Sequence, residues 1–389
     1  MTAKPPIGVL GSGTMGVGIA QVAAAAGHPV VLLDAEPPAL TRARSALETS
    51  VRGQVAKGRL PAPEGEALIA RVALASEVDA FRGCGLVIEA ITENLGAKRA
   101  AFARLEPMLA ADCLLASNTS SLSIAALALG LTAPQRFLGA HFFNPAPAMP
   151  LVEVVPGLDT APEALARAAA LITSWGKTTV IAQDTPGFIV NRIARPFYGE
   201  ALRQLDEGIA DVATIDWAMR ELGGFRMGPF ELMDLIGNDV NYQVTETIFA
   251  GFYGDARFRP SVTQKRLVEA GRLGRKSGRG FYDHREGAAR PEALRDSVLG
   301  QRILLRILVM LINEAADALH LRIASAADID LAMTTGVNYP KGPLRWADEL
   351  GARAVVDELA RLRDEYGEER YRPHPLLKRM AQEGRRFRD

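Results

Sequence analysis

Short apolar runs alternate with longer amphipathic stretches along the first half of the chain. Strands are predicted at residues 7–10, 30–33, 85–90, 114–117, 137–143, 152–155 and 179–182. Residues 38–74, between the second and third of these runs, are predicted to form a polar helical region. Strands that alternate with helices predict an α/β fold with a parallel, doubly wound sheet, which binds its ligands beyond the carboxyl ends of the strands.

The second half of the chain is helical and repeats itself. From about Thr185 the helical period dominates, and residues 192–237 match residues 306–351 at one constant offset, as Arg192 matches Arg306. This pattern predicts a duplicated helical domain with a linker at about residues 282–291. Asn191 aligns with Leu305, so the second copy lacks a polar group that the first one has.

The composition excludes several classes of protein. The chain has 389 residues, of which 48% are hydrophobic and 23% are charged, as in a soluble globular protein. The 45 basic residues balance the 45 acidic ones, which argues against binding to nucleic acid. Only Cys84 and Cys113 are present, so we expect a reducing cytoplasmic setting without disulfides. We expect no signal peptide, and no membrane span, because Arg306 interrupts the longest apolar stretch.

A glycine-rich turn follows the first predicted strand. Its sequence is Gly11-Ser12-Gly13-Thr14-Met15-Gly16, and an alanine-rich helix begins there. Gly11 permits a tight turn, Gly13 lets the backbone approach a pyrophosphate, and Gly16 lets the helix pack on the strand. Asp34 ends the second strand, where its carboxylate can accept hydrogen bonds from a ribose and repel a 2′-phosphate. The pattern predicts binding of NAD rather than NADP. The alternatives are an ordinary glycine turn and a strand-end cap at Asp34.

One of the five histidines lies where a sheet would place a catalytic base. His141 ends an apolar strand, whereas His28 precedes the second strand and the other three lie outside the sheet domain. Oxidation of an alcohol needs a base of near-neutral pKa, which histidine supplies. Glu153 is a charge inside the next apolar strand, and a buried carboxylate needs a partner. We expect Glu153 to orient His141. A core histidine with a structural role is the alternative.

Seven motifs in one order carry a family resemblance. They are GSGTMGVGIA (11–20), VIEAITENLGAK (87–98), SNTSSL (117–122), HFFNPAPAMPLVEVV (141–155), DTPGFIVNRI (184–193), GPFELMDLIG (228–237) and GRKSGRGFYD (274–283). Together they resemble the L-3-hydroxyacyl-CoA dehydrogenase family of fatty-acid β-oxidation. The resemblance is strongest to stand-alone bacterial 3-hydroxybutyryl-CoA and 3-hydroxyadipyl-CoA dehydrogenases with a duplicated C-terminal domain. It implies NAD-dependent oxidation of the 3-hydroxyl of an acyl-CoA.

The resemblance also implies a domain organisation. We expect a Rossmann NAD-binding domain at residues 1–184, followed by two tandem all-α domains like that of 6-phosphogluconate dehydrogenase. The first, at residues 185–283, would hold the substrate site and the domain interface, and the second, at residues 292–389, would be structural. In the family, a second copy takes the place of a partner subunit. The protein is therefore expected to be a monomer with an internal pseudo-dimer, or a homodimer.

The family's functional residues fall on specific positions of this chain. The implied catalytic residues are His141, Glu153, Ser120 and Asn191. The implied cofactor contacts are Gly11, Gly13, Thr14, Met15, Gly16, Asp34, Glu93, Lys98, Ser120, Asn144 and Lys276. The implied substrate contacts are Ser50, Lys57, Ser120 and Asn191, and no metal is expected.

Three other readings stay open. A relative that uses a lysine base would have to use Lys177, which lies on a turn before a strand. A sugar-acid dehydrogenase of the L-gulonate type and a non-catalytic, crystallin-like binding protein share the same scaffold. The presence of His141, Glu153 and Asn191 together disfavours the non-catalytic reading, because a structural protein has no need of all three.

Overall fold

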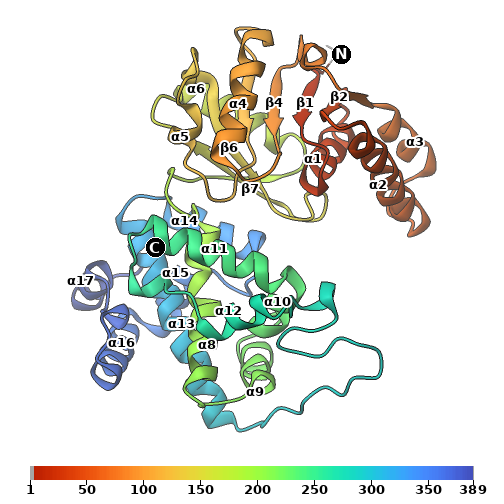
Figure 1. The fold of residues 1–389 in the computed structure, drawn as a ribbon. Helices are drawn as coiled ribbons and strands as arrows, with labels where there is room; N and C mark the ends of the chain where they lie inside the picture. Colours follow the sequence, from red (N-terminus) through yellow and green to blue (C-terminus); the bar gives the residue numbers. More distant parts are fainter. Residues whose placement is uncertain (1–3, 389) are drawn as a thin grey trace. The chain divides into compact units, whose positions relative to one another are not determined.

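The chain divides into two compact units. The computed structural model describes residues 4–388, and the units are Met1–Thr185, the sheet unit, and Pro186–Asp389, the helical unit (Figure 1). No helix within residues 4–388 is long and apolar enough to cross a bilayer. The limits of the two helical copies inside the second unit stay a prediction.

The sheet unit contains one twisted sheet with helices around it. Within residues 4–388 the sheet has eight strands: β1 (Ile7–Leu10), β2 (Val30–Leu33), β3 (Val72–Ala75), β4 (Leu86–Glu89), β5 (Leu114–Ser117), β6 (Phe137–Phe142), β7 (Leu151–Pro156) and β8 (Thr178–Ile181). Their order across the sheet is β3-β2-β1-β4-β5-β6-β7-β8. The helices are α1 (Thr14–Ala25), α2 (Pro37–Ala56), α3 (Ala62–Ala70), α4 (Leu95–Leu105), α5 (Ile124–Ala128) and α6 (Pro162–Thr173). The predicted α/β architecture is confirmed.

The central strands are buried along their whole length because helices cover both faces of a sheet of this type. β1, β4 and β5 have no exposed residue, and the alanine-rich helix α1 lies against β1 and β2 with its residues 16–24 buried. Small side chains let this helix approach the sheet closely. A Cβ added at Gly16 would lie 1.8 Å from the Gly11 carbonyl oxygen, so only glycine fits there.

Two features of the sheet differ from the prediction. Residues 72–75 form the edge strand β3, although they were assigned in part to a helical region. Strand β7 runs antiparallel to β6, while the other neighbouring strands are parallel. The connection from β6 to β7, residues 143–150, is too short for a crossover helix, and a connection of that length suits an antiparallel pair.

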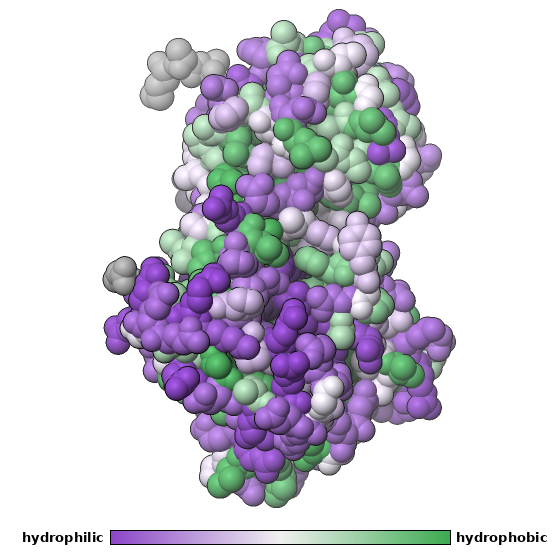
Figure 2. Space-filling view, turned by 90° about the vertical axis from the view of Figure 1, so that its left-hand side faces the viewer, coloured by the Kyte–Doolittle hydropathy of each residue, from purple (hydrophilic) through white to green (hydrophobic). Residues whose placement is uncertain are grey.

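The helical unit is built from α7 (Val190–Ile193), α8 (Arg195–Asp206), α9 (Val212–Trp217), α10 (Pro229–Ile236), α11 (Asn238–Gly251), α12 (Val262–Glu269), α13 (Ser297–His320), α14 (Ala326–Gly336), α15 (Pro343–Leu350), α16 (Ala352–Tyr366) and α17 (Pro375–Glu383). The long helix α13 is buried over most of its length and packs on α8. Figure 2 shows mostly hydrophilic residues on the visible face of this unit, as expected when the apolar faces of its helices are buried.

The repeat seen in the sequence is also a repeat of local structure. Asp216 accepts hydrogen bonds from two backbone N–H groups at the start of α10, and Asp330 does the same at the start of α15. The helices α10 and α15 are followed by Gly237 and Gly351, which both have positive φ angles, 105° and 85°. The turn after each helix requires that conformation, which glycine adopts without strain.

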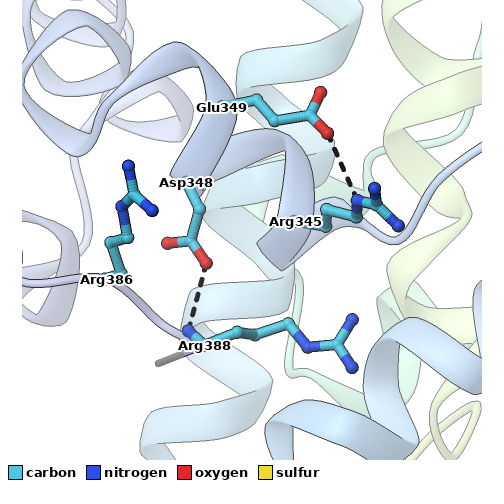
Figure 3. Close-up of a pocket in the computed structure, with 5 residues that line it drawn as sticks. All are labelled: Arg345, Asp348, Glu349, Arg386 and Arg388. Carbon is cyan, nitrogen blue, oxygen red and sulfur yellow. Dashed lines mark hydrogen bonds and ion pairs between the residues drawn. The ribbon is translucent and has the colours of Figure 1, made fainter.

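The repeat extends further than the sequence comparison indicated. Asp234 accepts hydrogen bonds from the backbone of Phe281 and Tyr282. Asp348 accepts them from the backbone of Phe387 and Arg388, and Figure 3 shows the bond from Arg388. The spacing between these later pairs is shorter than the main offset, so a fixed offset misses them. Tyr282 was expected to begin the linker, but it is buried and its hydroxyl donates to Asp216. The linker therefore starts after Tyr282.

Candidate active site

The glycine turn has the shape that a dinucleotide requires. Gly11 has a φ of 101°, and a Cβ there would lie 2.7 Å from the carbonyl oxygen of Ala90. A Cβ on Gly13 would meet nothing within 4 Å, so this side of the turn borders open space. Helix α1 begins at Thr14 without a side-chain cap and without an acidic residue in its first turn. Its positive N-terminal end therefore suits a pyrophosphate, and the turn fits the phosphates of NAD.

Asp34 is held beside this turn by Ser12. Its Oδ2 atom accepts hydrogen bonds from the Ser12 backbone N–H at 2.8 Å and from the Ser12 hydroxyl at 2.7 Å. The Oδ1 atom accepts one from the Glu36 backbone at 3.1 Å. Burial opposes ionisation of Asp34, but these hydrogen bonds outweigh it and lower its pKa. A carboxylate oxygen can accept two hydrogen bonds, so Oδ1 can still accept one from a ribose hydroxyl.

His141 and Glu153 form a buried pair near one end of the antiparallel ladder. They lie directly opposite each other on β6 and β7, and His141 Nδ1 is 2.6 Å from Glu153 Oε2. Glu153 is fully buried and His141 is 5% exposed. When Nδ1 carries the proton and donates to the carboxylate, the basic lone pair of the ring is on Nε2. This arrangement can orient an imidazole and stabilise its charged form.

Ser120 lies in the loop after β5, where Glu93 organises the backbone. The Glu93 Oε1 atom accepts hydrogen bonds from the Ser120 backbone N–H at 2.9 Å and from the Thr119 hydroxyl at 2.6 Å. Burial opposes ionisation of Glu93, but Lys98 and these hydrogen bonds lower its pKa. Lys98 Nζ lies 3.3 Å from Glu93 Oε2. Glu93 and Lys98 thus shape the loop that carries Ser120, whatever they contact in NAD.

A buried carboxylate that the sequence analysis did not single out joins the same network. Glu89, at the end of β4, accepts hydrogen bonds from Lys98 Nζ at 2.6 Å, from the Ser117 hydroxyl at 2.6 Å and from the Ile91 backbone at 2.7 Å. It connects the ends of β4 and β5 with the start of α4. The signal that could have found it resembles the one used for Glu153, because Glu89 is also a charge in an apolar strand.

The loop after β6 carries Asn144, and a second asparagine fixes the strand that leads to it. Asn118 Oδ1 accepts a hydrogen bond from the Phe142 backbone N–H at 2.8 Å. This contact ties the loop after β5 to the end of β6, one residue after His141. Asn118 lies in the SNTSSL motif but was not assigned a role. The structure gives it a positioning role.

The two predicted CoA contacts lie on or just after α2. Ser50 and Lys57 are seven residues apart, about two helical turns, so they project from one face of the helix. The Ser50 hydroxyl donates to Gln21 Oε1 at 2.9 Å, and Lys57 is exposed at the end of the helix. An exposed cation there can meet a phosphate. Their role as CoA contacts stays a prediction.

The other two predicted residues belong to the helical unit. Asn191 is in the short helix α7, and its carbonyl oxygen accepts a hydrogen bond from Arg195 at 2.8 Å. Lys276 lies after α12, where its Nζ is 2.6 Å from Asp239 Oδ1. Within residues 4–388, no group of three or more metal-ligating side chains is placed to hold a metal ion.

The comparisons with known proteins agree with this arrangement. The NAD-binding domain of 3-hydroxyacyl-CoA dehydrogenase matches residues 6–185, and its C-terminal domain matches twice, at residues 187–284 and 303–388. The 3-hydroxyadipyl-CoA dehydrogenase of Escherichia coli K12 is 40% identical, over 96% of this chain and 97% of that protein. The crystal structure of 3-hydroxybutyryl-CoA dehydrogenase from Escherichia coli K12 has a TM-score of 0.91 and 40% identity, covering 97% of this chain and 98% of that one.

A shorter relative matches only part of this chain. The crystal structure of (S)-3-hydroxybutyryl-CoA dehydrogenase from Ralstonia eutropha is 36% identical, with a TM-score of 0.70. It covers 72% of this chain and 99% of its own, as expected if it lacks a second helical copy. The matches extend over both units and all the motifs quoted above. The chain belongs to the 3-hydroxyacyl-CoA dehydrogenase family.

Proposed function

We propose that this protein oxidises the 3-hydroxyl group of an L-3-hydroxyacyl-CoA to a ketone, with NAD as the hydride acceptor. The observation that carries the proposal is the buried pair of His141 and Glu153 in the sheet that also holds the glycine turn. Two relatives of this chain are named for different acyl groups, 3-hydroxyadipyl and 3-hydroxybutyryl. The reaction would belong to fatty-acid β-oxidation or to a related catabolism of CoA thioesters such as phenylacetate degradation.

In this mechanism His141 is the general base. Its Nε2 atom takes the proton of the 3-hydroxyl as the hydride leaves C3, and Nδ1 keeps its hydrogen bond to Glu153. The negative charge of Glu153 stabilises the imidazolium that forms. Bound NAD supplies the hydride acceptor. In the reverse direction the imidazolium returns the proton to the oxygen of the reduced ketone.

The remaining predicted residues would bind and polarise the substrate. The Ser120 hydroxyl and the Asn191 amide would donate hydrogen bonds to the 3-oxygen or the thioester oxygen, which favours the charge that develops there. Glu93 and Asn118 would act through the backbone, because they hold the loops beside Ser120 and His141. Ser50 and Lys57 would contact CoA, and Lys276 would contact the cofactor.

The second helical copy would take the place of a partner subunit. The two copies are joined by reciprocal ion pairs, Arg192 with Glu314 at 2.6 Å and Arg306 with Glu200 at 3.0 Å. Because Arg306 and Glu314 are the repeat equivalents of Arg192 and Glu200, this is the exchange that a two-fold interface makes. We propose a monomer with an internal pseudo-dimer, located in the cytoplasm, where its two free cysteines stay reduced.

The test is turnover of acetoacetyl-CoA with NADH, followed by the absorbance of the reduced nicotinamide. Oxidation of NADH that depends on the CoA ester is expected. A purified protein that reduces no 3-oxoacyl-CoA but oxidises L-gulonate would support the sugar-acid dehydrogenase hypothesis instead.

The structure disfavours the alternative mechanism with a lysine base. Lys177 is buried and donates hydrogen bonds to the carbonyl oxygens of Ala146 and Met149.

A further inference from the structure

A buried arginine in the helical unit lacks the usual acidic partner. Arg195, at the start of α8, is 6% exposed. Its Nε donates to the Asn191 carbonyl at 2.8 Å, and its Nη1 donates to the Thr245 hydroxyl at 3.1 Å and to the Asn241 carbonyl at 3.5 Å. Among residues 4–388, no carboxylate forms a hydrogen bond or an ion pair with it. A buried cation of this kind is costly unless an anion balances it.

The charged and titratable groups around this guanidinium are tyrosines. It lies 4.9 Å from the ring centre of Tyr198, and burial lowers its pKa while the hydroxyls of Tyr198 and Tyr339 act in the opposite direction. Five N–H groups are available on a guanidinium, and the three acceptors named above leave some of them for a further acceptor. Asn191, one turn earlier in the chain, is the residue proposed to bind the substrate.

A buried hydroxyl from the second copy also lacks a partner. Tyr339 lies between α14 and α15 and is 5% exposed, and its ring packs 5.5 Å from that of Phe197. Among the described residues its hydroxyl has no hydrogen-bond partner. Such a group loses its bonds to water on burial, and a native structure rarely leaves one unsatisfied. Helix α14, which ends three residues before Tyr339, packs on α7, which ends two residues before Arg195. Burial raises the pKa of Tyr339, and the positive charge of Arg195 acts in the opposite direction.

The repeat shows what these positions contain when only packing is required. The equivalents of Arg195, Asn241 and Thr245 in the second copy are Val309, Val355 and Leu359, all buried. The equivalent of Tyr339 in the first copy is Phe225, which has no hydroxyl and is also buried. The packing of the fold therefore does not require a polar side chain at any of these four positions. The polar groups gather only beside Asn191, the amide that the second copy has replaced with leucine.

We propose that Arg195 and Tyr339 bind a carboxylate at the far end of the acyl chain, so that the enzyme is selective for dicarboxylic 3-hydroxyacyl-CoA substrates. This inference rests on the proposed function, because it takes Asn191 to face the substrate. The Arg195 side chain folds back by one helical turn, about 5.4 Å, to reach the Asn191 carbonyl. The guanidinium therefore lies directly beside the residue that is proposed to bind the substrate. The second copy thereby supplies a residue to the site of the first.

The test compares two substrates of equal length, 3-hydroxyadipyl-CoA and 3-hydroxyhexanoyl-CoA, which end in a carboxylate and a methyl group. The full-length protein is expected to have the higher kcat/KM with the adipyl substrate. Arg195→Met is expected to reduce the adipyl-to-hexanoyl ratio of kcat/KM by about 10- to 100-fold, the effect of a charged hydrogen bond. Tyr339→Phe, which copies the side chain of Phe225, is expected to reduce the ratio less. Arg302→Met removes an exposed charge and leaves the ratio unchanged.

The outcomes separate the two proposals. If neither substrate is oxidised by the unmodified protein, the proposed function is wrong. If both are oxidised with equal kcat/KM, the proposed function stands and the carboxylate site is refuted. Equal losses on both substrates in Tyr339→Phe and Arg195→Met would show that these groups only support the fold. Should Arg195→Met fail to fold, Tyr339→Phe and the unmodified protein still decide the question.

Discussion

His141 Nδ1 lies 2.6 Å from Glu153 Oε2, across a directly opposed pair of the only antiparallel ladder between named strands in residues 4–388. Because both residues are on strands, neither depends on a flexible loop for its position. When Nδ1 donates its proton to the Glu153 carboxylate, the lone pair that can accept a proton is on Nε2. The roles of the pair can be tested separately.

Changing His141 to Gln should lower kcat by about 10²- to 10⁴-fold, because the general base is lost while the side chain stays polar. Binding of NAD should persist, since His141 is not in the glycine turn. Steady-state kinetics and NAD titration measure both effects. Glu153→Gln should have a milder effect and alter the pH–rate profile. Turnover near that of the unmodified enzyme in His141→Gln would refute its role as the base.

Asp34 should make the enzyme prefer NADH to NADPH, because its carboxylate would repel the 2′-phosphate. We expect Asp34→Asn to lower the ratio of kcat/KM for NADH to kcat/KM for NADPH by at least about tenfold, because the repelling charge is lost. Ser12→Ala is the matched control, because it removes one hydrogen bond to Asp34 and keeps the charge. Its preference for NADH should persist. An unmodified enzyme that uses NADPH as well as NADH contradicts this reading.

Truncation after residue 290 should expose the surface that α13 covers and remove the partners of Arg192 and Glu200. The shortened protein is expected to dimerise, aggregate or melt at a lower temperature. Size-exclusion chromatography with light scattering, together with thermal unfolding, measures these effects. A truncated chain that stays monomeric with the same Tm and activity would show that the second copy does not replace a partner.

Asp317 should make the helical unit sensitive to acid. It pairs with Arg192, Arg257 and His374, and although burial opposes its ionisation, these partners lower its pKa. Because the pKa is lower in the folded state than in the unfolded state, the stabilisation is present above about pH 4 and is lost as the pH falls below that.

Asp317→Asn should therefore lower the free energy of unfolding by about 3 kcal/mol at pH 7, as expected when a buried ion pair is broken. The difference from the unmodified protein should shrink as the pH falls below about 4. Urea unfolding at several pH values measures it. Asp357→Asn, in an exposed pair, serves as the control and should change little. If Asp317→Asn lowered the stability by the same amount at all pH values, the loss would not come from the charge of Asp317.

The two cysteines should react slowly with alkylating reagents in the folded protein. Burial raises the pKa of Cys84 to about 11 and that of Cys113 to about 12, so little thiolate forms near neutral pH. Mass spectrometry after iodoacetamide treatment should find both unmodified in buffer and both modified in denaturant. Rapid modification of the folded protein would contradict the buried positions of the two thiols.

The sequence allowed the glycine turn, most strands of the core and the pairing of Glu153 with His141 to be predicted, because each shows in the pattern of apolar, glycine and charged residues along the chain. Edge strand β3 escaped prediction because it follows α3 without a turn residue to separate them. The antiparallel direction of β7 could have been inferred from the short connection before it. Glu89 could have been found from its charge at the end of an apolar strand. Asn118 was not singled out, because its importance lies in a contact with the distant residue Phe142. Tyr282 was misplaced for the same reason.

The reciprocal pairs of Arg192 and Arg306 have a consequence for how the protein can evolve. In a symmetric homodimer every substitution appears on both sides of the axis, so a change that benefits one site is imposed on the other. Tandem duplication removes that constraint, since each copy has its own codons. Arg195 and Val309 occupy equivalent positions and have diverged, as have Asn191 and Leu305. The first copy has polar side chains at these positions, whereas the second copy has apolar ones that pack against the first copy.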